Sequence, residues 1–280
     1  MKILFSNKTI GFRLFFWISI IGIGLFVFFP LYWMVNTSIK PSEGILNLEF
    51  FPKNPTLSNY KNVLTDIKII GYMKNSLFVA LLSSFFSTLV AALAGYSISK
   101  FRYKGRKEIM LLFMSSKMFP QALLLLTIYM TISYIGLRDS YLSLIMAFVT
   151  FTLPVGTWSL KCYFDKIPDE LIESAKIDGS SHMNTIVKII LPLAIPGLIS
   201  VAIYGFIWGW NDVLYSLTLI TSPDKRTLAP GLILSYMGEF QSNWGNMMTA
   251  SIVASIPVAL LFILSQKFFI EGLTAGAVKG

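Results

Sequence analysis

The chain has 280 residues, of which 55% are hydrophobic and only 13% are charged. Its mean hydropathy of +0.67 lies outside the range of ordinary soluble domains, and therefore indicates an integral membrane protein. The net charge of +9 is expected from cations that anchor such a protein near anionic lipid, so it does not indicate a nucleic-acid-binding protein. A single cysteine and a single histidine exclude an internal disulfide and a multi-histidine metal site.

Long apolar stretches recur along the chain. A bilayer core about 30 Å thick requires roughly 20 apolar residues in one helix. Six stretches meet or approach this length, at residues about 14–36, 75–99, 108–135, 140–162, 193–220 and 246–268. We therefore predict an all-α integral membrane protein with six transmembrane helices, organised as a single domain over residues 1–280. The first stretch follows a basic start, as a signal peptide does, but it is too long for one and we expect it to remain as a span.

Positive charges in the short connections predict the orientation in the cell membrane. The connection 100–107 carries five Lys and Arg residues, whereas the turn 136–139 carries one. Because short cytoplasmic loops carry the excess of cations, we expect residues 100–107 and both termini on the cytoplasmic side. Residues 37–71 then form an external loop, which we expect to be ordered, with a short helix near residues 58–65.

A polar segment, residues 167–192, separates the fourth and fifth apolar stretches. Pro168 and the acidic residues that follow it suit the N-terminus of a helix, and Gly179 can end that helix. Within the helix, Leu171 and Ala175 are expected to share one face.

A second helix is expected after the glycine. It would start at Ser180 or Ser181 and run to Pro192, which ends or kinks it. On these residues alone, the two helices form either an interfacial connection between spans or a knob that docks on a soluble partner.

The residues of this hairpin resemble a known motif. Glu-x-Ala-x-x-Asp-Gly at residues 173–179, followed after nine residues by Ile-x-Leu-Pro at residues 189–192, resembles the EAA loop of ATP-binding-cassette (ABC) importer permeases. Ser174 replaces the first Ala of that motif. The resemblance implies a coupling helix that sits in a cleft of a separate ATPase subunit. It assigns ATPase coupling to Glu173, Ser174, Ala175, Asp178, Gly179, Leu191 and Pro192.

Further segments resemble carbohydrate-uptake permeases, specifically the second, six-span permease of maltose-type importers. These segments are residues 36–43, 51–60, 118–120, 135–141, 210–212 and 266–280. Judged alone, the glycine-rich tail at residues 269–280 would be a disordered terminus. The resemblance implies instead a cytoplasmic tail that contacts the ATPase, through Gly272, Thr274, Gly276 and Lys279.

The resemblance implies a type I ABC importer fold and a permease subunit that moves a sugar or oligosaccharide by alternating access. The sequence contains no Gly-x-x-x-x-Gly-Lys-[Ser/Thr] phosphate loop, so the chain is not expected to be an enzyme or to hold a cofactor or metal. ATP and Mg would be bound by partner subunits. The partners implied are a second homologous permease, two ATPase subunits, an extracellular solute-binding protein and membrane lipid.

Two alternatives remain open at this stage. Glycerol-phosphate and polyol importer permeases share the same segments. An ion-coupled secondary transporter would also be apolar and basic inside, but it would need a repeat or acidic spans, and the sequence offers only Asp212.

Polar and aromatic residues within the spans are candidates for the substrate pathway. Lys117 is costly inside a membrane, so we expect it to face a cavity, to pair structurally or to snorkel. The fifth span offers candidates on one helical face, namely Trp208, Asn211, Asp212 and Tyr215. Such residues combine stacking surfaces with hydrogen-bonding groups, as sugar recognition requires. Trp210 is expected in the aromatic belt at the outer interface.

Overall fold

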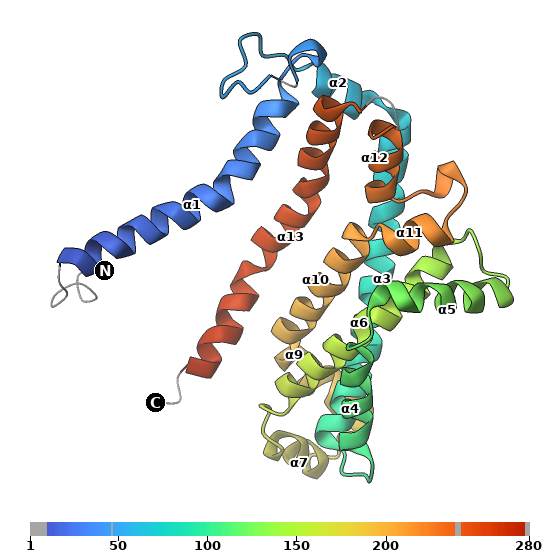
Figure 1. Cartoon of the computed structure of the whole chain (residues 1–280). Helices are drawn as coiled ribbons and strands as arrows, with labels where there is room; N and C mark the ends of the chain where they lie inside the picture. The colour runs from blue at the N-terminus through green and yellow to red at the C-terminus, as the bar shows by residue number, and fades with distance from the viewer. Residues whose placement is uncertain (1–9, 46, 239–241, 278–280) are drawn as a thin grey trace. The chain divides into compact units, whose positions relative to one another are not determined.

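A computed structural model describes residues 10–45, 47–238 and 242–277 of the chain (Figure 1). These residues are helical or irregular, and their one pairing of extended backbone is an isolated bridge between Met237 and Ser242. The predicted all-α class is therefore confirmed. The chain divides into two compact units, of which unit 1 is Met1–Asp66 with Ile233–Val253 and unit 2 is Ile67–Leu232 with Ala254–Gly280.

The described residues form long and short helices in the following chain order. The long helices are α1 (Ile10–Ser38), α3 (Ile67–Lys100), α4 (Arg106–Ser116), α5 (Gln121–Tyr134), α6 (Tyr141–Phe164), α10 (Ile195–Asn211) and α13 (Trp244–Ala277). The short ones are η2 (Ser42–Gly44), α2 (Ser58–Thr65), α7 (Glu170–Ile177), α8 (His182–Thr185), η3 (Ile186–Ile190), α9 (Leu191–Leu193), α11 (Leu214–Leu219), η4 (Pro223–Lys225) and α12 (Leu228–Tyr236).

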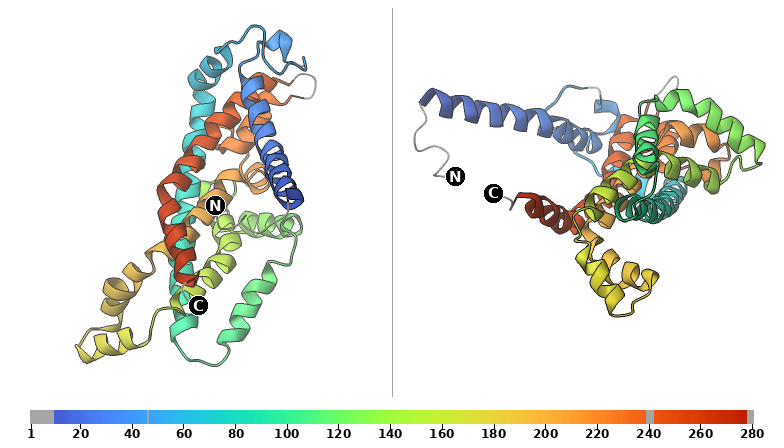
Figure 2. Two further views of the ribbon diagram at one scale, coloured as in Figure 1. Left: turned by 90° about the vertical axis from the view of Figure 1, so that its left-hand side faces the viewer. Right: turned by 90° about the horizontal axis from the view of Figure 1, so that it is seen from below.

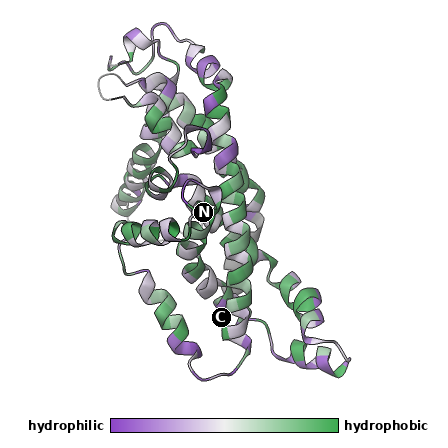
Figure 3. Cartoon of the chain, turned by 90° about the vertical axis from the view of Figure 1, so that its right-hand side faces the viewer, coloured by the Kyte–Doolittle hydropathy of each residue, from purple (hydrophilic) through white to green (hydrophobic). Residues whose placement is uncertain are grey.

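Helices α1, α3, α6 and α13 are each long and apolar enough to cross a membrane alone. Hydrophobic residues dominate the middle of α3 in Figure 3. Two further pairs of consecutive helices are apolar enough to cross a membrane together, and each adds one span if its bent pair is counted as a single span. The first pair is α4 with α5, bent by 102°, and the second is His182–Leu193 with α10, bent by 77°. The described residues thus hold four to six spans, and the count of six stays a prediction.

Two of the stretches predicted as spans are not single continuous helices. The stretch 108–135 is two helices rather than one, because Pro120 between α4 and α5 has no N–H and disfavours a helical residue before it. The stretch 193–220 is also interrupted. There α10 ends at Asn211, since the backbone of Asp212 is extended (φ −68°, ψ 133°).

In unit 2, α3 packs mainly against α6 and α10. Glycine permits this close approach. A Cβ built on Gly95 of α3 would lie 3.0 Å from the backbone N of Lys161 and from the backbone O of Thr157, both in α6. A Cβ on Gly205 of α10 would lie 3.0 Å from Oγ of Ser87 in α3. Such contacts through small residues are typical of helix packing in membranes, where lipid is as apolar as the side chains.

Replacing Gly95 by alanine is expected to lower the melting temperature of the assembled protein. The added methyl group meets backbone atoms that cannot rotate away, and overpacking of this kind costs about 1–3 kcal/mol. Gly71→Ala in the same helix is the matched control, because a Cβ there meets nothing within 4 Å and alanine is the better helix former. Equal melting temperatures for the two variants would contradict the close contact at Gly95.

Unit 1 contains the connection between α1 and α3, which is ordered where it is described. Lys40 is 1% exposed, its Nζ donates to the carbonyl of Asn47 at 2.9 Å, and it lies 4.9 Å from the ring centre of Trp33. Asn59 of α2 donates through Nδ2 to the carbonyls of Ser38 and Lys40, each at 2.9 Å. The short helix predicted in this connection is confirmed as α2.

Candidate functional site

The polar segment between α6 and α10 folds as a helical hairpin at one end of unit 2 (Figures 1 and 2). Helix α7 ends at Ile177, and Gly179, two residues further on, has a left-handed φ of +76°. The N–H of Gly179 donates to the carbonyl of Lys176 at 3.0 Å, and the N–H of Ser180 donates to the carbonyl of Ala175 at 2.9 Å. These are the two bonds of a Schellman motif. The predicted role of Gly179 as the residue that ends the helix is confirmed.

The second arm of the hairpin begins at Ser181, whose Oγ accepts a hydrogen bond from the N–H of Asn184 at 3.3 Å. The arm continues through α8, the π-helical turn η3 and α9. The sequence predicts that Pro192 ends or kinks this arm. The arm ends at Leu193, one residue after Pro192, and the bend of 77° comes at Ala194, so this prediction is confirmed to within two residues.

The apolar face of the hairpin packs on the ends of the membrane helices. Ile172 and Ala175 of α7, with Ile190 of the second arm, are buried in one core with Phe164 of α6. Leu171 and Ala175, which lie four residues apart in α7, share a helix face as predicted, but Leu171 is 40% exposed and Ala175 is buried. Residues three apart also share a helix face, and here Ile172 and Ala175 are the pair that is buried.

The opposite face of α7 is open to solvent. Among the residues that the motif assigns to coupling, the exposed ones are Glu173, Ser174, Asp178, Gly179 and Pro192. Ala175 is buried and Leu191 is half-buried, so these two support the hairpin from within. Ile177, the last residue of α7, is 86% exposed. The motif does not include Ile177. Its position, two residues before the glycine of the turn, could have identified it as an exposed apolar residue at the tip of the hairpin.

Lys100, the last residue of α3, holds the start of the hairpin. Its side chain is 7% exposed, and Nζ donates to the carbonyl of Ile167 at 2.5 Å and to Oδ1 of Asp169 at 2.7 Å. A buried cation must find such partners, so these bonds fix where α7 begins relative to α3. In the sequence, Lys100 is one of five cations in residues 100–107, and nothing distinguishes it from the others.

The same contact sets the ionisation of Asp169. The hydrogen bond from Lys100 and its positive charge hold the pKa of Asp169 below its usual value. Because the folded pKa is lowered, the contribution of this carboxylate to stability is complete above its ordinary pKa and is lost as the pH falls through the folded pKa. Near neutral pH the contact is therefore fully formed.

A second group of predicted residues borders an open cavity of about 440 Å³ where α10 ends. Trp208, Asn211 and Asp212 line it, together with Gln121 and Tyr204, which no sequence motif marks. Gln121 is the first residue of α5, directly after Pro120. A polar residue at this place in an apolar stretch could have identified it as a candidate for the substrate pathway. An indole beside amide and carboxylate groups provides both the stacking surface and the hydrogen-bonding partners that a sugar requires.

Helix α10 does not continue through this cavity as predicted. The carboxylate of Asp212 accepts a hydrogen bond from the N–H of Ser216 at 2.8 Å and so caps the start of α11. The prediction that the candidates of the fifth span share one helical face is therefore wrong. Tyr215 is fully buried, its hydroxyl donates to the carbonyl of Gln121 at 2.8 Å, and its ring centre lies 4.9 Å from that of Phe151.

Lys117 lies in the break between α4 and α5 and is not among the residues that line the cavity. Its Nζ donates to the carbonyl of Phe151 in α6 and lies 5.8 Å from the centre of the Phe151 ring. That ring in turn stacks on Trp208, with ring centres 5.2 Å apart. Lys117 thus pairs with α6 of its own chain, and Phe151 connects it to Trp208, which lines the cavity.

Trp210 is 4% exposed, and its Nε1 donates to the carbonyl of Ala254 in α13 at 3.2 Å. Its ring stacks on Phe206, one turn earlier in α10. The prediction that Trp210 belongs to an interfacial aromatic belt is wrong, because its N–H is bonded inside the protein.

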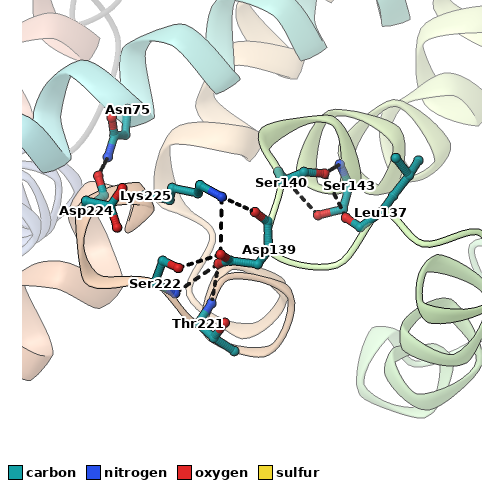
Figure 4. Close-up of polar contacts among 9 residues, drawn as sticks. All are labelled: Asn75, Leu137, Asp139, Ser140, Ser143, Thr221, Ser222, Asp224 and Lys225. Carbon is teal, nitrogen blue, oxygen red and sulfur yellow. Dashed lines mark hydrogen bonds and ion pairs between the residues drawn. The ribbon is translucent and has the colours of Figure 1, made fainter.

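A polar network fixes the chain that follows α11 (Figure 4). Asp139, at φ +53° between α5 and α6, accepts hydrogen bonds from the N–H groups of Thr221 and Ser222, each at 2.9 Å. The hydroxyl of Ser222 and Nζ of Lys225 also donate to its carboxylate. These donors, above all the Ser222 hydroxyl, hold the pKa of Asp139 far below its usual value. Asp212 and Asp139 therefore fix α11 from its two ends.

The C-terminal residues predicted to contact the ATPase lie at the end of α13. The backbone of Gly272, Thr274 and Gly276 is helical, because α13 continues to Ala277. The sequence judged alone predicts a disordered tail, whereas the resemblance implies an ordered one. The continuous helix to Ala277 agrees better with the second expectation. Lys279 lies outside the described residues.

Residues 83–274 match the family model described as "Binding-protein-dependent transport system inner membrane component". The chain is 37% identical to the inner membrane ABC transporter permease protein YcjP of Escherichia coli (strain K12), over 92% of the chain and 95% of the relative. It is 34% identical to the trehalose/maltose transport system permease protein MalG of Thermococcus litoralis, over 94% and 95%. A bacterial ABC transporter involved in the import of alginate has a chain of similar fold, with a TM-score of 0.80 at 20% identity over 94% and 99%.

Proposed function

Because the chain belongs to the family of binding-protein-dependent transport system inner membrane components, we propose that it is the permease subunit of an ATP-driven importer for a sugar or oligosaccharide. The family predicted from the hairpin and the C-terminal segment is confirmed, and so is the importer-permease fold. Family membership overturns the alternative of an ion-coupled secondary transporter. The trehalose/maltose relative favours a sugar over glycerol phosphate or a polyol.

One observation carries the coupling role. The hairpin buries Ile172 and Ala175 in a core shared with the membrane helices, while Glu173, Ser174 and Ile177 of the same helix are exposed. A displacement of the exposed face is therefore transmitted to α6 and α10 through packed side chains, because a close-packed core does not deform freely. This is the property expected of a coupling helix that docks on an ATPase subunit.

The energy comes from other chains in this proposal. The permease works with a second homologous permease, two ATPase subunits that bind ATP and Mg, and an extracellular solute-binding protein. ATP binding brings the two docked hairpins together and opens the membrane helices outward, and hydrolysis returns them. The chain is a multi-pass membrane protein with both termini on the cytoplasmic side, which is supported by the five cations of residues 100–107.

The proposed function is tested by ATP hydrolysis in proteoliposomes that contain this chain with its co-purifying permease and ATPase subunits. Binding protein and a panel of trehalose, maltose, longer oligosaccharides and glycerol 3-phosphate are added in turn. We expect stimulation by a sugar, lost in Glu173→Ala and kept in the matched control Glu170→Ala, which removes an exposed acid from the first turn of α7. A preparation without ATPase, or one stimulated only by glycerol 3-phosphate, would overturn the proposal.

The cavity at the end of α10 is the surface of this chain that we expect the sugar to contact. Trp208→Ala and Asn211→Ala are expected to raise the apparent KM for transport about tenfold, the usual effect of losing a stacking or hydrogen-bonding group worth about 1–2 kcal/mol. Lys117→Gln is expected to lower the maximal rate with the KM unchanged, since Lys117 touches α6 and not the cavity. A KM effect confined to Lys117→Gln would reverse these assignments.

A further inference from the structure

A second cavity, of about 510 Å³, lies where α3 and α6 end and α4 begins. Because α3 and α6 are both apolar enough to cross a membrane, their ends lie at its boundary. Helix α4 and the hairpin project from this same end of unit 2 (Figures 1 and 2). The residues assigned so far to coupling or to the sugar pathway do not line this cavity.

The lining of this cavity is cationic. It contains Arg106, Lys107 and Lys161, and among the described residues its acidic member is Asp165. Lys161 donates to Oδ2 of Asp165 at 2.5 Å, and Ser99 donates to Oδ1 at 2.6 Å. Burial would raise the pKa of Asp165, but these hydrogen bonds outweigh it and hold the pKa below its usual value. Lys161 and Asp165 neutralise each other, and the first turn of α4 adds two cations to the lining, while the acid of that turn, Glu108, is not among the lining residues.

The two cations of α4 are placed to receive an anion. Nη1 of Arg106 donates to the carbonyl of Phe101 at 3.2 Å, which orients the half-buried guanidinium and leaves other N–H donors on it. A planar guanidinium binds phosphate oxygens in pairs, and Lys107 adds a second, exposed cation. Both residues stand in the first turn of an eleven-residue helix, where the free N–H groups and the helix dipole also favour an anion.

The remaining wall of the cavity is apolar. Ile98 of α3 and Met110 and Leu111 of α4 form it. Leu111 is 68% exposed, as is its neighbour Leu112, so the apolar wall continues onto the outer surface of α4. A small inorganic anion would use the cations alone. A phospholipid would use both parts, because its phosphate suits the cations and its acyl chain suits the apolar wall.

We infer that this cavity binds an anionic membrane phospholipid. Its phosphate lies against Arg106 and Lys107, and an acyl chain lies along Met110 and Leu111. The bound lipid then fills the space between α4 and the end of α6, whose last residue, Phe164, lies three residues before Ile167 at the start of the hairpin. This site does not depend on the transported substrate, because its recognition chemistry concerns the headgroup and acyl chain alone.

Native mass spectrometry of the assembled, delipidated complex tests the inference. Dioleoyl phosphatidylglycerol or dioleoyl phosphatidylcholine is added back, and the lipids retained per complex are counted. The variant Arg106→Gln/Lys107→Gln is compared with Arg102→Gln/Lys104→Gln, which removes two exposed cations from the same connection outside the cavity. A third variant, Leu111→Trp, keeps every charge and fills the apolar wall. Size-exclusion chromatography confirms assembly of each complex.

We expect Arg106→Gln/Lys107→Gln to weaken retention of phosphatidylglycerol at least about tenfold, since each cation near an anionic headgroup contributes several-fold in affinity. Leu111→Trp should also weaken it, whereas the control pair should bind as the wild type does. Equal loss in both charge pairs, or equal retention of phosphatidylcholine, would overturn the site. Displacement of phosphatidylglycerol by millimolar inorganic phosphate, with Leu111→Trp without effect, would show a free-anion site and would overturn the lipid assignment.

Discussion

Replacing Gly179 by proline is expected to abolish the stimulation of ATP hydrolysis by binding protein and sugar. Proline fixes φ near −65°, whereas residue 179 has φ +76°, and proline lacks the N–H that Gly179 donates to the carbonyl of Lys176 at 3.0 Å. It also disfavours the backbone that Asp178 adopts before it. An incompatible proline costs about 3 kcal/mol or more, which lowers the ratio of correctly closed to open hairpins roughly a hundredfold.

The matched control is Gly179→Asn. Asparagine is tolerated in the left-handed region, and a Cβ at this position meets nothing within 4 Å. The Asn variant should therefore keep at least about half of the stimulation, since the left-handed penalty for asparagine is small. Both complexes are measured in proteoliposomes at equal ATPase content. Normal stimulation in the proline variant, or an equal loss in both variants, would show that the geometry of this turn does not matter for coupling.

Replacing Lys100 by methionine is expected to loosen the hairpin without removing it. Methionine fills similar space but donates no hydrogen bond, so the carbonyl of Ile167 and the carboxylate of Asp169 lose their shared partner. A hydrogen bond from a charged group contributes about 1.5–3 kcal/mol. Asp169 is 65% exposed, so water replaces much of its share, and the larger loss falls on the contact with Ile167.

This loosening is measured by hydrogen exchange of the α7 amides in the assembled complex and by the number of sugar molecules imported per ATP. Exchange in Lys100→Met should be about tenfold faster or more, in line with a loss of more than 1.4 kcal/mol, and fewer sugars should be imported per ATP. Lys104→Met, an exposed lysine of the same connection, should change neither quantity. Identical exchange in the two variants would contradict the anchoring role of Lys100.

The features predicted correctly from the sequence are those set by local chemistry. Gly179 ends α7 because glycine alone adopts a left-handed conformation without strain, and the residues before it have a helical pattern. The spans α3 and α6 follow from uninterrupted apolar length, and α2 follows from the polar residues after Pro55. The family to which the spacing motif belongs is confirmed, whereas the coupling role of the residues in that motif stays a prediction.

The features that sequence reasoning missed depend on contacts between distant residues. The apolar composition of a stretch is the same whether it forms one helix or two, so it does not predict the break at Asp212. The structure shows that break, because the carboxylate of Asp212 caps α11. Trp210 is a residue type that is common in interfacial aromatic belts. Its burial and its hydrogen bond to the carbonyl of Ala254 become evident only in the folded structure. Lys100 likewise looks like any cation of its connection. Its two partners lie 67 and 69 residues away in the chain.

The measurement that tests the account most directly is site-specific crosslinking from the exposed face of α7. Cys162 is replaced by serine, and a single cysteine is placed at Ser174, or at Thr131 on the exposed surface of α5 as a control. A short thiol-to-amine crosslinker is added to the assembled transporter with and without ATP. We expect Ser174→Cys to form a product with the ATPase subunit whose yield changes with ATP, and Thr131→Cys to form none. No product from position 174, or equal products from both positions, would contradict the coupling role of the hairpin.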